Sequence, residues 1–269
     1  MHSKSAIFLG TKPAAAIALQ ILVGRGWDIK GVVTPLEDLH PWASGPKVAE
    51  VAELNNIPVY QDQVSLNAHS LKADLVISYM YRSLVKPETI NSAKVAALNF
   101  HPAPLPYFGG WAFYNVAIIE DVVSYGPTCH YMDEDFDTGP ILKVDRFEVD
   151  ASRETAVSLE RKTQISMLNL FKEVVGMVEQ NIQLPIEYQK DSEMRYFNKK
   201  EFESLKRIPC TATADVIDKF ARAFWYPPYM GAYLELDSGK VEIVPEIVKE
   251  DIARHYHYDD YEILKQSTT

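Results

Sequence analysis

The feature that most constrains the fold of this chain is a series of short apolar runs separated by segments with helical periodicity. The runs are nearly continuous rather than alternating, which is typical of strands buried on both faces. They comprise residues 6–9, 29–34, 75–78 and 95–99. Segments 13–23 and 47–55 carry apolar residues at helical spacing. This β-α-β order predicts an α/β fold with a doubly wound, mostly parallel, Rossmann-like sheet, which binds ligands at the carboxyl ends of its strands.

The pattern continues to about residue 180, where it ends in a long helix. Residues 124–132 and 141–149 indicate further strands, and residues 155–180 carry apolar side chains roughly on one face of a helix. We therefore predict a catalytic domain over residues 1–185.

The remaining segment, residues 186–269, is predicted to form a small α+β extension. Residues 213–223 indicate a helix, and Asp237-Ser238-Gly239 lies between two short apolar runs, which is typical of a β-hairpin. The apolar hairpin after Gly231 is a candidate surface for a homodimer.

Charge and composition narrow the possible partners. The chain has 269 residues with 27 Lys plus Arg and 37 Asp plus Glu, a formal net charge of −10. We do not expect so acidic a chain to bind nucleic acid or anionic membranes through broad charge attraction. No apolar stretch reaches the roughly 18 residues that indicate a membrane span. The two cysteines, Cys129 and Cys210, show no C-x-x-C pattern, which favours a reducing, cytoplasmic location and gives no indication of a zinc site.

The residues most able to carry chemistry lie at the end of the fourth apolar run and just after it. Asn99 and His101 are two positions apart, so in a strand they share a face. With a distant carboxylate, Asp137, they could supply an oxyanion donor, a proton acceptor and an anion that orients the imidazole. From the residues alone a plainer interpretation is favoured, in which Asn99 caps a turn, His101 is an ordinary histidine and Asp137 belongs to an exposed acidic loop.

These motifs resemble those of the folate-dependent formyltransferase family. The resemblance favours the catalytic interpretation of Asn99, His101 and Asp137 over the plainer one. The family pattern is Asn-x-His, a Leu-Pro turn and a later Asp-x-Gly, which Asn99-Phe100-His101, Leu105-Pro106 and Asp137-Thr138-Gly139 match. Further segments that resemble the family are Gly10-Thr11, Val32-Val33-Thr34-Pro35, Asn56-Ile57-Pro58-Val59 and Gly126-Pro127-Thr128-Cys129-His130. The resemblance covers about residues 6–180 and is most like the sugar N-formyltransferases that act on nucleotide-linked amino sugars.

The resemblance implies transfer of the formyl group of N10-formyltetrahydrofolate to an amine, without a metal. The amine would attack the formyl carbon, and Asn99 would donate a hydrogen bond to the resulting oxyanion. His101 would take a proton from the amine and pass it to the departing folate nitrogen, while Asp137 orients the imidazole and raises its basicity. His130 is expected to support the site without acting as a base.

Folate contacts are also implied by the resemblance. The family holds the pterin mainly through backbone hydrogen bonds from two loops, and the corresponding residues here are Tyr79, Met80, Tyr81, Arg82, Asp133 and Asp135. For Tyr79 and Tyr81, aromatic packing at the end of a strand is an open alternative.

The nucleotide-linked sugar is expected to contact a second set of residues. These are Lys12, Gly109, Gly110, Trp111, Trp225 and Tyr226. Lys12 would bind the pyrophosphate, unless it is a solvated lysine. The segment from Gly109 to Phe113 is predicted to open a helix whose backbone amides could bind a phosphate or a sugar hydroxyl. Trp225 and Tyr226 could stack on a base or a hexose, or could instead seal a domain junction.

Three kinds of acceptor suit the family: an aminoacylated tRNA, a purine-pathway ribonucleotide and a nucleotide-linked amino sugar. From Asp191 onward the chain has 11 basic and 15 acidic residues, which argues against a tRNA. The purine-pathway enzymes resemble only a shorter version of this chain. We therefore predict a sugar N-formyltransferase that acts on an amino-dideoxy sugar destined for a surface polysaccharide. The alternatives are hydrolysis of formyltetrahydrofolate, formyl transfer to another small amine, and a non-catalytic protein that binds folate or a nucleotide.

Overall fold

The computed structural model describes residues 3–35, 44–111, 113–190 and 193–254, which form two compact units. The first unit contains Met1–Phe113, Ser124–Phe147 and Arg161–Phe197, and the second contains Tyr114–Val123, Glu148–Glu160 and Asn198–Thr269. The domain boundary expected between residues 185 and 186 stays a prediction. In the described part of the chain, no helix is long and apolar enough to cross a membrane.

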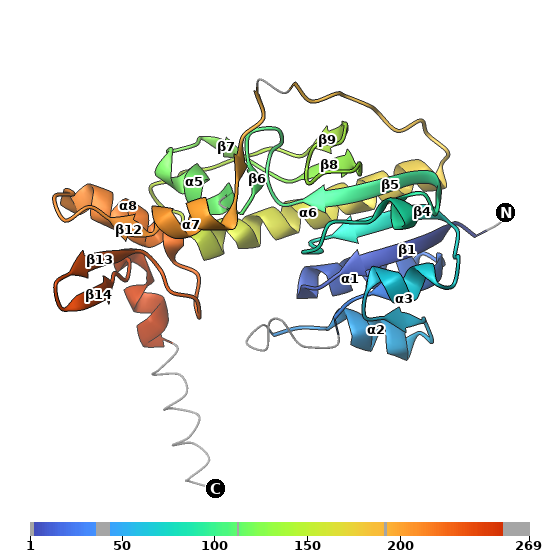
Figure 1. The fold of residues 1–269 in the computed structure, drawn as a ribbon, viewed down its shortest axis with the longest axis horizontal. Coiled ribbons are helices and arrows are strands. Elements are labelled where there is room, and N and C mark those ends of the chain that lie inside the picture. Colours follow the sequence, from blue (N-terminus) through green and yellow to red (C-terminus); the bar gives the residue numbers. More distant parts are fainter. Residues whose placement is uncertain (1–2, 36–43, 112, 191–192, 255–269) are drawn as a thin grey trace, which may run out of the picture. The chain divides into compact units, whose positions relative to one another are not determined.

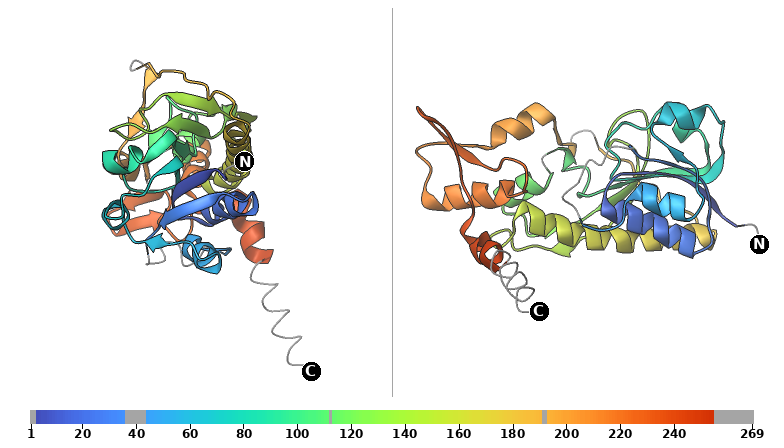
Figure 2. Two further views of the ribbon diagram at one scale, coloured as in Figure 1. Left: turned by 90° about the vertical axis from the view of Figure 1, so that its right-hand side faces the viewer. Right: turned by 90° about the horizontal axis from the view of Figure 1, so that it is seen from below.

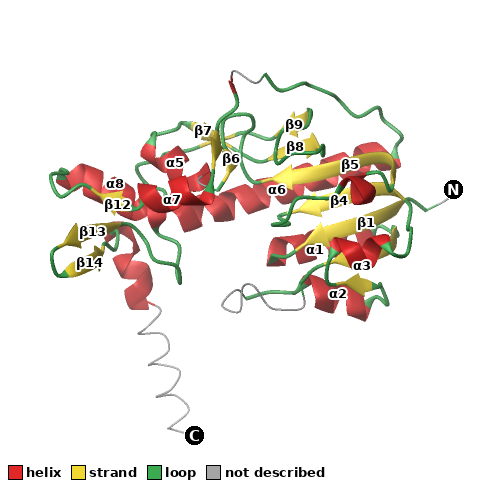
Figure 3. Ribbon diagram, viewed as in Figure 1, coloured by secondary structure: helices red, strands yellow, loops and turns green. Residues whose placement is uncertain are grey.

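A seven-stranded sheet with the order β3-β2-β1-β4-β5-β8-β9 forms the centre of the first unit (Figure 1). Its strands are β1 (Ser5–Gly10), β2 (Asp28–Val33), β3 (Val59–Tyr60), β4 (Ala73–Tyr79), β5 (Ala93–His101), β8 (Thr128–Tyr131) and β9 (Ile141–Val144). The strands from β3 to β5 are parallel, whereas β8 and β9 are antiparallel to their neighbours. Figure 3 shows β1, β4 and β5 side by side in this sheet. The predicted α/β fold with a mostly parallel sheet is confirmed.

Helices cover both faces of the sheet, and α1 and α3 lie on opposite sides of it (Figure 2). The helices of this unit are α1 (Pro13–Gly24), α2 (Val48–Leu54), α3 (Gln63–Asn67), α4 (Pro87–Ile90) and the C-terminal part of α6 (Ala156–Glu179). Along β1, Ala6 and Phe8 belong to one buried cluster, and Ile7 and Leu9 belong to the other. Because each face of the strand is covered, its apolar residues need not alternate with polar ones.

Two of the predicted strands are each divided in the structure. Segment 124–132 forms β7 (Ser124–Tyr125) and β8, and segment 141–149 forms β9 and β10 (Phe147–Glu148). At the first break the backbone of Gly126 approaches residue 145 so closely that a Cβ would lie 1.8 Å from the Asp145 carbonyl oxygen. Pro127, which follows, has no N–H to donate to a neighbouring strand. The two segments therefore contain strands as expected, but each is divided into two.

The second unit contains the predicted hairpin. It includes the residues of α5 (Phe113–Ile119) from Tyr114 onward. Its other elements include α7 (Lys199–Leu205), β12 (Arg207–Ile208), α8 (Ala214–Phe224), β13 (Tyr233–Leu236), β14 (Gly239–Glu242) and the 3-10 helix Glu246–Val248. β13 and β14 pair antiparallel, with Leu236 opposite Gly239. Arg222 of α8 is buried and donates to the carbonyl oxygens of Ala151 and Glu154, which fixes this helix within the unit.

Candidate active site

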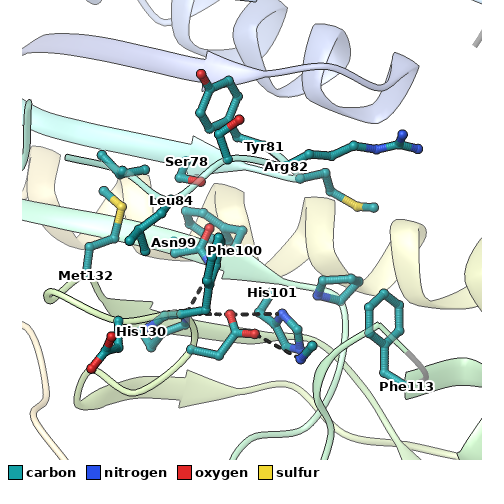
Figure 4. A pocket seen from close by; sticks show the side chains of 18 of the residues that line it. Ser78, Tyr81, Arg82, Leu84, Asn99, Phe100, His101, Phe113, His130 and Met132 are labelled. Carbon is teal, nitrogen blue, oxygen red and sulfur yellow. Dashed lines mark hydrogen bonds and ion pairs between the residues drawn. The ribbon is translucent and has the colours of Figure 1, made fainter. Parts of the chain in front are cut away.

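A cavity of about 280 Å³ lies at the carboxyl edge of the large sheet, within the first unit (Figure 4). Its walls come from the ends of β4 and β5, from β8, and from the loops that follow these strands. The predicted site residues that line it are Lys12, Met80, Tyr81, Arg82, Asn99, His101, Gly110, Trp111, Asp133, Asp135 and Asp137. The cavity is therefore at the edge of the sheet where a doubly wound fold binds its ligands.

Asn99 and His130 face each other at one end of this cavity (Figure 4). They are directly paired across β5 and β8, and Asn99 Nδ2 lies 2.9 Å from His130 Nε2. His130 Nδ1 lies 2.7 Å from the carbonyl oxygen of Tyr131, which can only accept, so Nδ1 carries a proton. In the neutral ring Nε2 therefore accepts a hydrogen bond from Asn99. This contact fixes the amide and leaves the second N–H of Asn99 for another partner.

His101 ends β5 and is buried between two acceptors. Its Nε2 lies 2.8 Å from the carbonyl oxygen of Phe108, and its Nδ1 lies 3.3 Å from Oδ1 of Asp137. Both partners can only accept, and the contact with the carbonyl is the shorter, so we assign the proton of the neutral ring to Nε2, which leaves Nδ1 as the basic atom. Burial lowers the pKa of His101, while the charge of Asp137 and the Phe108 carbonyl oppose that shift. A proton gained at Nδ1 would thus be stabilised by Asp137.

Asp137 lies between the two imidazoles. Its Oδ1 is 3.7 Å from His130 Nε2, and its Oδ2 accepts from the N–H of Gly110 at 3.2 Å. Burial alone would raise the pKa of Asp137, but His101 and the Gly110 N–H outweigh it and hold this pKa well below its usual range. The carboxylate is therefore ionised at neutral pH. Among the described residues, no group of three or more His, Cys, Asp or Glu side chains could hold a metal ion.

One buried hydroxyl ties the turn after β5 to β8. Thr128 Oγ1 accepts from the N–H of Leu105 at 3.0 Å and donates to the carbonyl oxygen of Ala103 at 2.7 Å. Thr128→Val keeps the shape but leaves these buried groups unpaired, so we expect the free energy of unfolding to fall by about 2 kcal/mol. Urea denaturation measures this change. The exposed control Thr211→Val should change it by less than about 0.5 kcal/mol, and equal effects of the two variants would contradict the assigned role of the hydroxyl.

Five of the six predicted folate contacts line the cavity, and Tyr79 does not. The Tyr79 side chain is fully buried, stacks on Phe100 at 5.6 Å and meets Phe171 edge-on at 5.7 Å. Aromatic packing therefore describes Tyr79. Met80, the next residue, has a φ of +53° and its carbonyl oxygen accepts from Thr11 Oγ1 at 3.0 Å. The chain thus turns at Met80, and the following loop enters the wall of the cavity.

The predicted segment from Gly109 to Phe113 enters a helix only at its last residue. Gly109–Gly110 forms strand β6, paired with β11 (Tyr196–Phe197), and α5 begins at Phe113. The N–H groups of Gly109, Gly110 and Trp111 donate to Arg195 O, Asp137 Oδ2 and Phe197 O. Because each of these three amides already donates to an acceptor within the protein, the structure does not leave them available for a phosphate or a sugar hydroxyl. Gly110 and Trp111 still line the cavity.

Trp225 and Tyr226 belong to the second unit, where they follow α8 and are half-buried. The cavity is lined by residues of the first unit. The predicted contact of these two aromatic residues with the sugar nucleotide stays a prediction.

Two aromatic residues that the sequence did not single out also line the cavity. Phe136 and Tyr196 are 44% and 49% exposed, similar to the 48% of Trp111. The available signal for Phe136 was an apolar side chain within an acidic loop. Tyr196 gave none, because its position depends on the pairing of β11 with β6. The cavity thus combines polar groups at one end with large flat side chains that could cover a ring system.

Comparisons with known proteins agree with this arrangement. Residues 42–175 match the formyl transferase family. The GDP-perosamine N-formyltransferase of Brucella melitensis biotype 1 is 34% identical over 181 residues, 65% of this chain and 65% of that protein. The methionyl-tRNA formyltransferase of Clostridioides difficile is 30% identical over 201 residues, 71% of this chain and 64% of that protein. The chain therefore spans slightly less than two thirds of the length of these curated relatives.

A solved structure shows the same fold over most of the chain. It is the N-formyltransferase from Helicobacter canadensis in complex with folinic acid and dTDP-3-aminofucose, with a TM-score of 0.73 at 21% identity, covering 89% of this chain and 86% of that one. The fold and the cavity together define an α/β protein with acid-base groups at the carboxyl edge of its sheet. More particularly, residues 42–175 match the formyl transferase family, which confirms the resemblance found in the sequence.

Proposed function

We propose that the protein is an N-formyltransferase that moves the formyl group of N10-formyltetrahydrofolate to the amine of a nucleotide-linked amino-dideoxy sugar. The observation that carries the proposal is the meeting of the Asn99 amide, the His101 imidazole and the Asp137 carboxylate at one end of the cavity. Attack of an amine on a formyl carbon develops an oxyanion and a positively charged nitrogen. This cluster offers a hydrogen-bond donor for the first and a proton acceptor for the second.

The steps balance with these groups. The amine nitrogen bonds to the formyl carbon, and the carbonyl electrons move to the oxygen, which accepts from the second N–H of Asn99. His101 Nδ1 takes the amine proton, and Asp137 stabilises the imidazolium. The bond from carbon to folate N10 then breaks, and N10 receives the proton from His101. The products are a formamide and tetrahydrofolate.

Two observations support a sugar as the acceptor. The acidic balance of the chain from Asp191 onward, 11 basic to 15 acidic residues, is unfavourable for holding a tRNA. A related protein is a GDP-perosamine N-formyltransferase, whose acceptor is named as an amino sugar nucleotide. Because another relative is a methionyl-tRNA formyltransferase, the experiment includes that acceptor.

The test is an assay of the purified protein with N10-formyltetrahydrofolate and a panel of GDP- and dTDP-linked amino sugars. We expect formylated sugar by mass spectrometry and one tetrahydrofolate for each formamide. Formate release at a rate that does not depend on added sugar would identify a hydrolase. Formylation of methionyl-tRNA alone would identify a tRNA enzyme. Tight folate binding without turnover would indicate a binding protein. Any of these three results overturns the proposed function.

Lys12 is the proposed contact for the pyrophosphate of the sugar nucleotide. It follows β1 and lines the cavity, where its ammonium can pair with phosphate oxygens. Lys12→Ala should raise the KM for the sugar nucleotide about 10-fold with little change in kcat. Initial-rate kinetics with each substrate varied in turn measure this. Lys94→Ala removes the same charge from an exposed position at the start of β5 and should leave both constants unchanged; a kcat effect alone for Lys12→Ala would contradict the assignment.

A homodimer and a cytoplasmic location belong to the same proposal. The hairpin leaves several apolar side chains of the second unit partly exposed, among them Leu236, Val241 and Val244. A second copy of the chain could cover them, which supports the hairpin as the dimer surface. The cytoplasmic location follows from the sequence alone.

A further inference from the structure

The chain segment that follows α6 contacts two parts of the site, the loop that carries Asp137 and the strand β6 that contains Gly110. Glu187 and Ile141 exchange two backbone hydrogen bonds, at 2.7 and 2.9 Å, next to the loop that carries Asp137. Further on, β11 pairs with β6, whose Gly110 donates to the Asp137 carboxylate. This segment lies beyond residues 42–175, the part of the chain that matches the family.

Between these two pairings, the side chain of Gln189 reaches the backbone of the Asp137 loop. Its Nε2 donates to the carbonyl oxygen of Asp137 at 2.8 Å and to that of Gly139 at 2.7 Å. Both hydrogens of the amide nitrogen are therefore used. Its Oε1 is buried and has no hydrogen-bond partner among the described residues. The reversed amide would place that oxygen against two carbonyl oxygens, so the two acceptors dictate the orientation of the amide.

The backbone that Gln189 holds is unusual. Asp137 has a φ of +61°, a left-handed conformation that residues with a Cβ adopt at a cost. At Gly139 the chain approaches so closely that a Cβ would lie 1.9 Å from the carbonyl oxygen of Tyr131. The backbone is therefore constrained both at Asp137 itself and two residues later at Gly139. A donor from another segment that binds the carbonyl groups of both residues can keep this conformation in place.

We propose that Gln189 is a positioning residue, which fixes the backbone of Asp137 so that its carboxylate lies between His101 and His130. An amide of this length is suited to the task because it offers two donors from one nitrogen without a charge. A displacement of Asp137 would lengthen its 3.3 Å contact with His101 Nδ1 and weaken the stabilisation of the imidazolium. Gln189 thus acts through Asp137 and not on a substrate.

The kinetic test is a double-mutant cycle, whose readout rests on the proposed formyl transfer. Gln189→Met keeps the length of the side chain and removes both donors, so we expect kcat to fall about 10- to 100-fold with both KM values unchanged. In the Asp137→Asn background the same change should have no further effect, because the carboxylate it positions is gone. Multiplicative losses, or a wild-type kcat for Gln189→Met, would overturn the proposal.

Two controls separate positioning from folding. Gln183→Met changes an exposed glutamine of the same segment and should leave kcat and the melting temperature unchanged. If Gln189→Met does not fold, Gln189→Asn, which keeps the amide but shortens the side chain by one methylene, is taken through the same cycle with the same expectation.

A second readout does not depend on turnover. The charge of Asp137 raises the pKa of His101, so an NMR titration of the His101 ring reports how close that charge lies. We expect Gln189→Met to lower this pKa towards its value in Asp137→Asn, and Gln183→Met to leave it unchanged. An unchanged His101 titration in Gln189→Met would overturn the proposal. If wild-type protein formylates no sugar but the titration shifts as expected, the proposed function fails and the positioning role stands.

Discussion

Asp137→Asn should lower kcat for formyl transfer by about 10³-fold and leave the KM of both substrates within about twofold of wild type. The substitution keeps the size of the side chain and removes its charge. Burial lowers the pKa of His101, and the carboxylate 3.3 Å from Nδ1 is the charge that opposes this effect. Without it, the imidazolium that forms after attack by the amine loses its stabilising partner. The transition state is then less stabilised, whereas the binding of both substrates is unchanged.

Steady-state kinetics and isothermal titration with a folate analogue measure the two halves of this prediction. Glu134→Gln is the matched control, since it removes one carboxylate charge from an exposed position in the same loop. It should change kcat by less than about twofold. If Asp137→Asn and Glu134→Gln had similar kcat values, the carboxylate would have no part in proton transfer and the mechanism would be wrong.

The large sheet could be predicted from the sequence because its strands are covered on both faces. The continuous apolar run 6–9 follows directly from that burial, and β1 spans it. The break at Gly126 could not be predicted, because it depends on a close approach to Asp145, a contact between distant parts of the chain. Local periodicity reports how a segment is buried, but not which backbone crosses it.

The same distinction applies to the site. Asn99 and His101 could be placed together because they alternate along one strand, and the family motif pointed to Asp137. The pairing of Asn99 with His130 depends on the register of β5 against β8, which neither residue signals. The role of Gln189 is even harder to predict from the sequence, since its contact with the Asp137 loop depends on the course of the chain after α6. The residues that perform the proposed chemistry were therefore easier to predict than those that hold them in position.

Asn99→Ala should lower kcat by about 10²- to 10³-fold, again without raising either KM appreciably. His130 takes one N–H of the Asn99 amide at 2.9 Å, and its own Nδ1 is fixed by the Tyr131 carbonyl oxygen, so the amide cannot reverse without losing this bond. The second N–H is thereby directed before any substrate binds. A donor held in this way gains most as the formyl oxygen acquires negative charge, so its loss should appear in kcat.

Initial rates and substrate titrations of the Asn99→Ala variant measure this effect. Asn91→Ala, at an exposed position before β5, provides the control and should retain wild-type kinetics. A rise in KM with kcat preserved would mean that Asn99 binds the ground state of a substrate and does not stabilise an oxyanion. Because the donor and the base act on different atoms of the same intermediate, Asn99→Ala should also leave the NMR titration of His101 close to that of wild type. A large shift there would show that the amide acts by arranging the imidazole and the carboxylate, and the oxyanion would need another donor.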